Sequence, residues 1–251
     1  KFSCAWLGHF HLLSEHATCL TAARVLLEDP QTECHSTIAA QLQRAAVDGH
    51  TWLSRIAFQA HADKLVQPAL LASVRAPSVT YVPAIPRRIA KTGALSEPQL
   101  EALFYAAQWH SQPLRPSGSR NGFLLAVGAG VGKGRTQAAI ILDSWLQGHQ
   151  KALWVSASAD LFTDARRDLE AISTSMARMP QLHSMLISLT QLPLNGPTPA
   201  PPGILYASYA LLARPGRRAQ VIAWCQARRP FPGVLALDES HRAKAAGSTG
   251  A

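Results

Sequence analysis

A chain of 251 residues, 47% of them hydrophobic, has enough apolar material for one large or two small domains, which excludes disorder of the whole. The formal charge of +9, from 24 basic and 15 acidic residues, favours a polyanionic partner, although a solvated arginine-rich surface gives the same sum. The longest apolar stretch, from Ile204 to Ala213, is shorter than the roughly 20 residues of a spanning helix, so we expect no membrane partner.

Residues 1–75 carry apolar side chains at helical intervals, for example at Leu20, Ala23 and Leu26. We therefore predict a small all-helical region over residues 1–75. The cysteines and histidines of this region lack the paired spacing of a zinc site, so they are interpreted as packing residues. Three prolines follow in residues 76–95, which we interpret as a linker.

Residues 96–251 alternate short apolar runs with amphipathic stretches, which is typical of an α/β domain with a mainly parallel sheet. The predicted strands are Phe123–Val127, Ala152–Ser156, Met185–Leu189, Gly203–Ser208 and Val234–Leu237. The predicted helices cover about 96–110, 132–147, 159–172 and 216–229.

A glycine-rich turn stands between the first of these strands and the following helix. The segment 123–136 reads F-L-L-A-V-G-A-G-V-G-K-G-R-T, which is the context of a phosphate-binding loop. Gly128, Gly130 and Gly132 allow the backbone to curl, so that N–H groups and a helix N-terminus face phosphate oxygens. Lys133 adds a positive charge that can reach the β- and γ-phosphates of a nucleotide.

The loop departs twice from the usual G-x-x-x-x-G-K-[ST] pattern. Val127 stands where the first glycine belongs, and Gly134 stands where a hydroxyl normally binds magnesium. Thr136 is close enough in sequence to be a substitute, but the sequence leaves open where its hydroxyl points. A tight turn with an exposed lysine is the alternative, which the strand and helix on either side disfavour.

An acidic box follows the last predicted strand, in the segment V-L-A-L-D-E-S-H at 234–241. Ligands of open α/β sheets bind at the carboxyl ends of the strands, where Asp238 and Glu239 are expected. Asp238 would hold magnesium through its water shell, Glu239 would orient or deprotonate the attacking water, and His241 could sense the γ-phosphate. The box alone also fits a solvated loop, so the inference depends on its pairing with the phosphate loop.

This pairing resembles motifs I and II of superfamily 2 helicases, whose motor has two RecA-like domains. Four strings narrow the resemblance: L-S-E-P-Q-L-E-A-L-F-Y-A-A-Q (95–108), G-A-G-V-G-K-G-R-T (128–136), L-W-V-S-A-S-A-D-L (153–161) with A-R-R-D-L (165–169), and D-E-S-H-R-A-K (238–244). Together they look like the helicase-like strawberry notch family over about residues 80–251. The loop of that family also reads G-K-G-R-T, which implies that Gly134 is a family trait and strengthens Thr136 as a metal-side candidate.

The resemblance implies a RecA-like P-loop NTPase domain over residues 96–251 that binds ATP and Mg²⁺. It implies nucleotide contacts at Gln99, Gly128, Gly130, Gly132, Lys133, Gly134, Arg135 and Thr136, metal ligands at Asp238 and Thr136, and catalysis by Lys133, Asp238, Glu239 and His241. By the same analogy, Ser156, Ser158, Arg166 and Ser208 would contact nucleic acid.

Two of these roles have competing interpretations. Gln99 lies where related helicases read the adenine edge, but Ser96 and Gln99 also have the spacing of a capping box, and the two roles are compatible. Arg166 fits a solvated helix face better than a nucleic-acid contact.

The function implied by the resemblance is that of an ATP hydrolase, the ATP-binding half of a helicase-like motor that couples hydrolysis to binding or remodelling of DNA or RNA. The alternative is a non-hydrolysing P-loop scaffold in transcription or chromatin regulation. A P-loop kinase would need a lid and an acceptor site, and nothing in the sequence marks either.

Two expectations concern the setting of the chain. Because it begins at Lys1 and stops soon after His241, we expect a fragment with little activity of its own and a second RecA-like domain beyond residue 251. Four cysteines without a C-x-x-C pair fit a reducing cytoplasm, and we expect a bacterial or mobile-element source.

Overall fold

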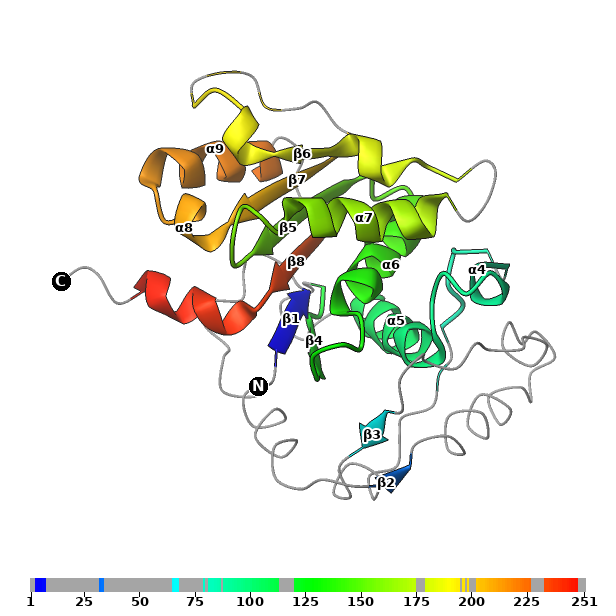
Figure 1. Ribbon diagram of the computed structural model, residues 1–251. Coiled ribbons are helices and arrows are strands. Elements are labelled where there is room, and N and C mark those ends of the chain that lie inside the picture. The colour runs from blue at the N-terminus through cyan, green and yellow to red at the C-terminus, as the bar shows by residue number, and fades with distance from the viewer. Residues whose placement is uncertain are drawn as a thin grey trace.

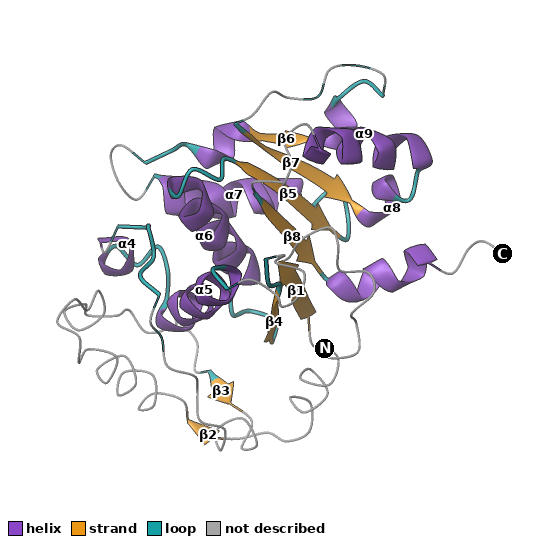
Figure 2. Cartoon of the chain, turned by 180° about the vertical axis from the view of Figure 1, so that it is seen from behind, coloured by secondary structure: helices purple, strands orange, loops and turns teal. Residues whose placement is uncertain are grey.

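The computed structural model describes residues 3–7, 32–33, 65–67, 79, 81–86, 88–112, 120–174, 179–194, 196, 198, 202–226 and 233–247. A six-stranded sheet runs through the centre of the molecule, and helices cover both of its faces (Figures 1 and 2). Within the described residues, no helix is long and apolar enough to cross a membrane.

The sheet places the carboxyl ends of five strands at one edge. Its order is β4 (Phe123–Val127), β1 (Ser3–Leu7), β8 (Val234–Asp238), β5 (Lys151–Ser156), β7 (Gly203–Ser208) and β6 (Leu186–Ser188). The last four strands pair in parallel. Because β1 is antiparallel to both β4 and β8, those two strands run in the same direction. The prediction of a mainly parallel sheet is therefore confirmed.

Helices α5 (Glu97–His110), α6 (Lys133–Leu146) and α7 (Phe162–Ser173) lie on one face of the sheet, and α8 (Tyr209–Leu212) and α9 (Pro215–Gln226) lie on the other (Figures 1 and 2). The remaining elements are α4 (Arg88–Lys91), the 3-10 helices Leu182–Met185, Leu189–Gln191 and Ser240–Gly247, and the pair β2 (Thr32–Glu33) and β3 (Val66–Gln67).

Strand β5 joins the two halves of the core. All six of its residues are buried, and alternate side chains point to opposite faces. Trp154 packs into the cluster under α5, α6 and α7, whereas Leu153 and Val155 pack into the cluster that contains Val221 and Trp224 of α9. A strand covered on both faces reads as a continuous apolar run, which is how the sequence predicted it.

The predicted strands and helices of residues 96–251 are present, with ends shifted by up to three residues. The all-helical region is not confirmed, because the described stretches 3–7, 32–33 and 66–67 are strands. Strand β1 pairs with β4 and β8, two segments far away in the sequence. The spacing of apolar residues within residues 1–75 cannot predict such long-range pairing. The other predicted helices of residues 1–75 lie outside the described residues.

Candidate functional site

The phosphate loop lies between β4 and α6. Gly130 and Gly132 have φ of +88° and +84°, in the left-handed region that favours glycine. Helix α6 begins at Lys133, so its first N–H groups face the loop. The Nζ atom of Lys133 lies 3.4 Å from the carbonyl oxygen of Gly128, which it can donate to, so the side chain folds back over the loop. This is the geometry of an anion cradle.

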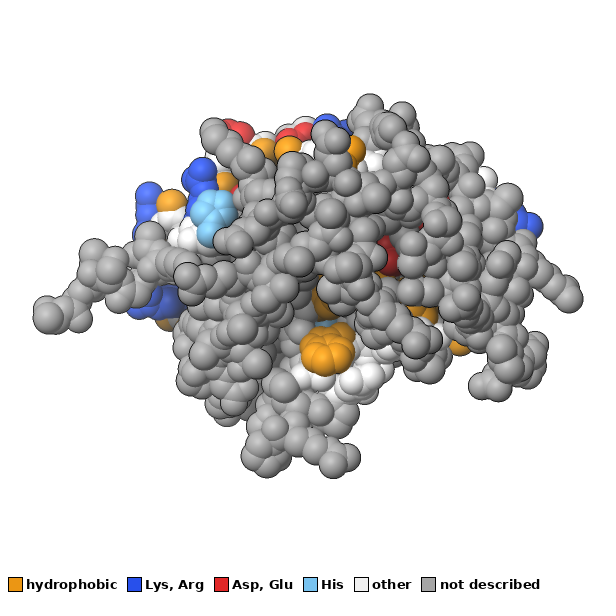
Figure 3. Space-filling view, turned by 90° about the horizontal axis from the view of Figure 1, so that it is seen from below, with side chains coloured by type: hydrophobic (Ala, Val, Ile, Leu, Met, Phe, Trp, Pro, Cys, Tyr) orange, Lys and Arg blue, Asp and Glu red, His pale blue; other side chains and the backbone are white. Residues whose placement is uncertain are grey.

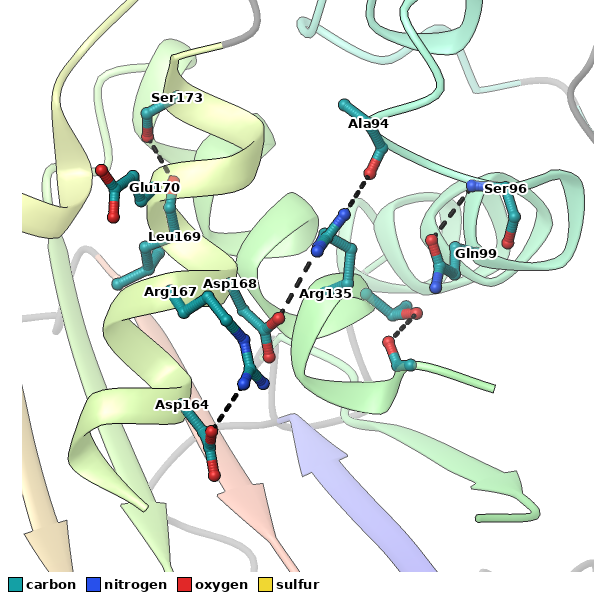
Figure 4. A network of polar contacts seen from close by, with 12 residues as sticks. Ala94, Ser96, Gln99, Arg135, Asp164, Arg167, Asp168, Leu169, Glu170 and Ser173 are labelled. Atoms are coloured by element: carbon teal, nitrogen blue, oxygen red, sulfur yellow. Dashed lines mark hydrogen bonds and ion pairs between the residues drawn. The ribbon is translucent and has the colours of Figure 1, made fainter. Parts of the chain in front are cut away.

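Gln99 fastens the start of α5 to this loop. Its Oε1 accepts a hydrogen bond from the backbone N–H of Ser96 at 3.0 Å, and its Nε2 donates to the carbonyl oxygen of Val131 at 2.9 Å (Figure 4 shows the first contact). A Cβ at Gly132 would collide with this Nε2. Gln99 therefore makes its half of the predicted capping box, and its amide also contacts the loop. Its contact with adenine stays a prediction.

Gly134 and Thr136, the two positions of α6 considered for the missing metal-binding hydroxyl, both pack against other residues of the protein. Thr136 is 3% exposed, and its Oγ1 donates to the carbonyl oxygen of Gly132 at 3.4 Å. The space beside Gly134 is occupied by Oδ2 of Asp168 from α7, so a Cβ at this position would require that carboxylate to move. Arg135 points to the same carboxylate, with Nε 3.6 Å from its Oδ1. The metal role of Thr136 stays a prediction.

Asp238 is the last residue of β8, and it is held by Ser156 at the end of the adjacent strand β5 and by Tyr209 at the start of α8. Its Oδ2 accepts a hydrogen bond from Ser156 Oγ at 2.9 Å, and its backbone carbonyl accepts one from the Tyr209 hydroxyl at 2.8 Å. Burial, followed by the charges of Asp238 and Glu239, raises the pKa of the Tyr209 phenol, which therefore stays a donor. The sequence predicted a nucleic-acid contact for Ser156 instead, and no local sequence pattern marks either of these two contacts with Asp238.

Glu239 has a φ of +51°, and among the described residues it is the one non-glycine residue with a positive φ. Such a conformation costs about 1–3 kcal/mol and is concentrated at functional sites. The Nδ1 atom of His241 lies 3.4 Å from Oε2 of Glu239, so the predicted catalytic acid and histidine are neighbours.

The loop and the acidic box share one edge of the sheet, because β4 and β8 run in the same direction. One strand, β1, lies between them, so the two strands are about 10 Å apart. Asp238 is thus the last residue of its strand, and Glu239 and Lys133 follow their strands, at the edge where ligands of open α/β sheets bind. Among the described residues, no group of three or more histidine, cysteine, aspartate or glutamate side chains is placed to hold a metal ion by itself.

Three of the four residues predicted to contact nucleic acid have hydroxyl groups that make hydrogen bonds to other groups of the chain. Ser156 is 1% exposed and donates to Asp238. Ser158 donates to Oδ2 of Asp160 at 2.9 Å, and Ser208 caps α8 by accepting from the N–H of Leu211. The fourth, Arg166, is exposed on α7. Among the described side chains of the face seen in Figure 3, Lys and Arg lie towards the margins.

A separate cavity of about 310 Å³ lies away from the loop, at the C-terminal ends of α5 and α6. Its lining includes Arg120, His149 and Asp143. The Asp143 carboxylate accepts hydrogen bonds from the Tyr81 hydroxyl at 2.7 Å and from the N–H groups of Ala84 and Ile85 at 2.6 Å and 3.3 Å. Burial raises the pKa of Asp143 although these donors lower it, so the group serves here as a structural acceptor.

Comparison with known proteins gives a family match over most of the chain. Residues 60–251 match the family described as P-loop containing NTP hydrolase pore-1. The chain is 43% identical over 197 residues to protein strawberry notch homolog 2 of Homo sapiens, 40% over 195 residues to the strawberry notch homolog of Caenorhabditis elegans, and 37% over 193 residues to strawberry notch of Drosophila melanogaster. No solved structure matches the chain.

These alignments cover 73–75% of this chain but only 10–13% of the length of the three relatives. The chain therefore corresponds to a small part of each relative. All three relatives are eukaryotic, so the expectation of a bacterial or mobile-element source has no support.

Proposed function

The chain belongs to the strawberry notch family of helicase-like P-loop domains, and from this premise we propose that it is the ATP-binding half of a superfamily 2 motor. In this proposal, ATP hydrolysis is coupled to the binding or remodelling of DNA or RNA. The observation that carries it is that the phosphate loop and the acidic box follow strands ending at the same sheet edge. A second RecA-like domain would belong to the whole protein.

The residues of this edge fit a magnesium nucleotide. The positive φ angles of Gly130 and Gly132 open the loop, and Lys133 supplies a cation at the N-terminus of α6. Bound Mg²⁺ would neutralise the charge of the β- and γ-phosphates. Asp238 would hold the metal through water, and Glu239 would orient the attacking water.

The contacts of Asp238 provide a physical link between ATP hydrolysis and nucleic acid bound nearby. Ser156 ends β5 and binds the carboxylate of Asp238, whereas Tyr209 begins α8 directly after β7 and binds its backbone carbonyl. We propose that nucleic acid binds at the segments that directly follow β5 and β7. The charge of +9 favours such a partner.

One observation favours the second candidate, a non-hydrolysing scaffold. The loop has no hydroxyl at Gly134, and the hydroxyl of Thr136 bonds to the loop backbone. A weak metal site would slow hydrolysis and leave nucleotide as a structural ligand.

Turnover of ATP by the whole protein, with and without DNA or RNA, separates the two candidates. If the protein is a motor, DNA or RNA should stimulate its ATP turnover. Glu239→Gln should lower kcat by about 100-fold or more while nucleotide still binds. Absence of turnover with every nucleic acid, despite tight nucleotide binding, would favour the scaffold.

A further inference from the structure

The phosphate loop has a carboxylate where its usual hydroxyl is absent. In the common loop pattern, the residue after the lysine carries a hydroxyl for the metal, and here that residue is Gly134. The space beside Gly134 is filled, because a Cβ there would collide with Oδ2 of Asp168. Figure 4 shows Asp168 reaching from α7 towards the first turn of α6, next to Arg135.

This carboxylate has weak partners inside the protein. The nearest guanidinium atom, Nε of Arg135, is 3.6 Å from Oδ1, too far for a hydrogen bond, and it is buried without a hydrogen-bond partner. The Nη1 atom of Arg135 donates a hydrogen bond to the carbonyl oxygen of Ala94 at 3.1 Å. Arg167, on the same helix as Asp168, pairs with Asp164 at 2.8 Å.

The side chain of Asp168 is 15% exposed. Burial raises its pKa even though Arg135 and Arg167 act in the opposite direction. The two arginines thus offset the cost of burying this carboxylate only in part, and the carboxylate lies beside the helix end that would face a triphosphate. Carboxylate oxygens are ligands that Mg²⁺ prefers.

We propose that Asp168 replaces the missing loop hydroxyl and holds the nucleotide's metal ion, directly or through a water molecule. The inference rests on the proposed function, since the metal arrives with the nucleotide. It explains why the loop reads G-K-G: a serine or threonine at 134 and the carboxylate of Asp168 need the same space. Thr136 is not required for this role, because its hydroxyl bonds to Gly132.

The test measures nucleotide and Mn²⁺ affinity in the whole protein rather than activity. A fluorescent ADP is titrated with Mg²⁺ or with EDTA, and Mn²⁺ binding to the nucleotide complex is followed by electron paramagnetic resonance. The variants are Asp168→Ala, Asp168→Asn, Gly134→Ser and the double variant Gly134→Ser with Asp168→Ala. Asp164→Ala is the control, because it removes an exposed carboxylate from the same helix.

Asp168→Ala and Asp168→Asn should lower Mn²⁺ affinity by about tenfold or more and leave binding in EDTA unchanged or tighter. Gly134→Ser alone should impair binding through the collision. The double variant rebuilds the common loop and should recover most of the Mn²⁺ affinity, while Asp164→Ala should behave as wild type.

Unchanged Mn²⁺ affinity in folded Asp168→Asn would overturn the inference. An equal loss of affinity in Mg²⁺ and in EDTA would do the same, since it would assign Asp168 a structural role. If the wild-type protein binds no nucleotide under either condition, the proposed function itself fails, which is a distinguishable result.

Discussion

Gly132 and Gly148 have similar backbone angles but different surroundings. This difference allows the role of the phosphate loop in nucleotide binding to be tested. Gly132 has a φ of +84° and contacts Gln99, whereas Gly148 has a φ of +91° and open space around it. Gly148 follows Gln147, the C-cap residue of α6, and its N–H donates to the carbonyl oxygen of Trp145 at 3.0 Å. The first glycine belongs to the candidate site and the second only to a helix end.

Gly132→Ala should therefore weaken nucleotide binding, whereas Gly148→Ala should only destabilise the fold. The first change forces the loop away from Gln99, and we expect a loss of affinity of about tenfold or more, equivalent to about 1.4 kcal/mol. The second should lower the free energy of unfolding by about 1 kcal/mol and leave affinity unaltered. Calorimetric titration and urea unfolding measure the two quantities, and equal nucleotide affinity in both variants would disprove the distinction.

Glu101 makes stability depend on pH. Burial, with a smaller effect from Glu97, raises the pKa of Glu101 from 4.5 to about 7. The folded chain therefore binds this proton more tightly than the unfolded chain, and the associated stability is lost as pH rises from about 4.5 through about 7. Above about pH 8 the effect is constant, because Glu101 is then ionised in both states.

Glu101→Gln should remove this loss. Relative to wild type, the variant should gain about 1–3 kcal/mol in the free energy of unfolding between pH 4.5 and pH 8. Urea unfolding at several pH values measures it, with the exposed Glu170→Gln as control. Parallel pH profiles of wild type and Glu101→Gln would show that Glu101 has an ordinary environment.

At the scale of elements, Asp143 joins helix α6 to the segment that precedes α4. Its carboxylate accepts from the Tyr81 hydroxyl and from the N–H groups of Ala84 and Ile85. Ile85 and Ile89 are buried in the core near this junction. Residues 81–86 and 88–91, which lie within the predicted linker of residues 76–95, are thus packed onto the domain.

Asp143→Ala should leave these donors without an acceptor and lower the free energy of unfolding by about 3 kcal/mol. Asp143→Asn keeps an acceptor oxygen without a buried charge, so its cost should be smaller. Urea unfolding of both variants, with exposed Asp164→Ala as control, provides the comparison. A change below about 0.5 kcal/mol in Asp143→Ala would contradict the role of the carboxylate.

The strands and helices that the sequence predicted correctly are marked by a local pattern of residue types. Strand β5 reads as an apolar run because both of its faces are covered, and α6 starts at a glycine turn followed by Lys133. Strand β1 has no such signal, because its pairing with β4 and β8 connects distant parts of the chain. Similarly, Gly134 marked an anomaly in the loop, but only the packing of α7 on α6 revealed Asp168.

At the scale of the whole molecule, strand direction decides whether the two motifs can act together. The sequence located the phosphate loop and the acidic box, and it predicted the parallel sheet that brings them to one edge. It could not predict that β1 lies between their strands, nor that Ser156 and Tyr209 bind Asp238, since these contacts depend on tertiary packing. The central claim is that Lys133 and the acids at Asp238 and Glu239 serve one nucleotide.

Equilibrium titration of the whole protein with Mg-ADP tests this claim most directly, using wild type and the Lys133→Ala variant. We predict that wild type binds and that Lys133→Ala abolishes measurable binding, while the far-UV spectrum and melting temperature stay close to wild type. If folded Lys133→Ala keeps the wild-type affinity, the loop is not a nucleotide site and the account is wrong.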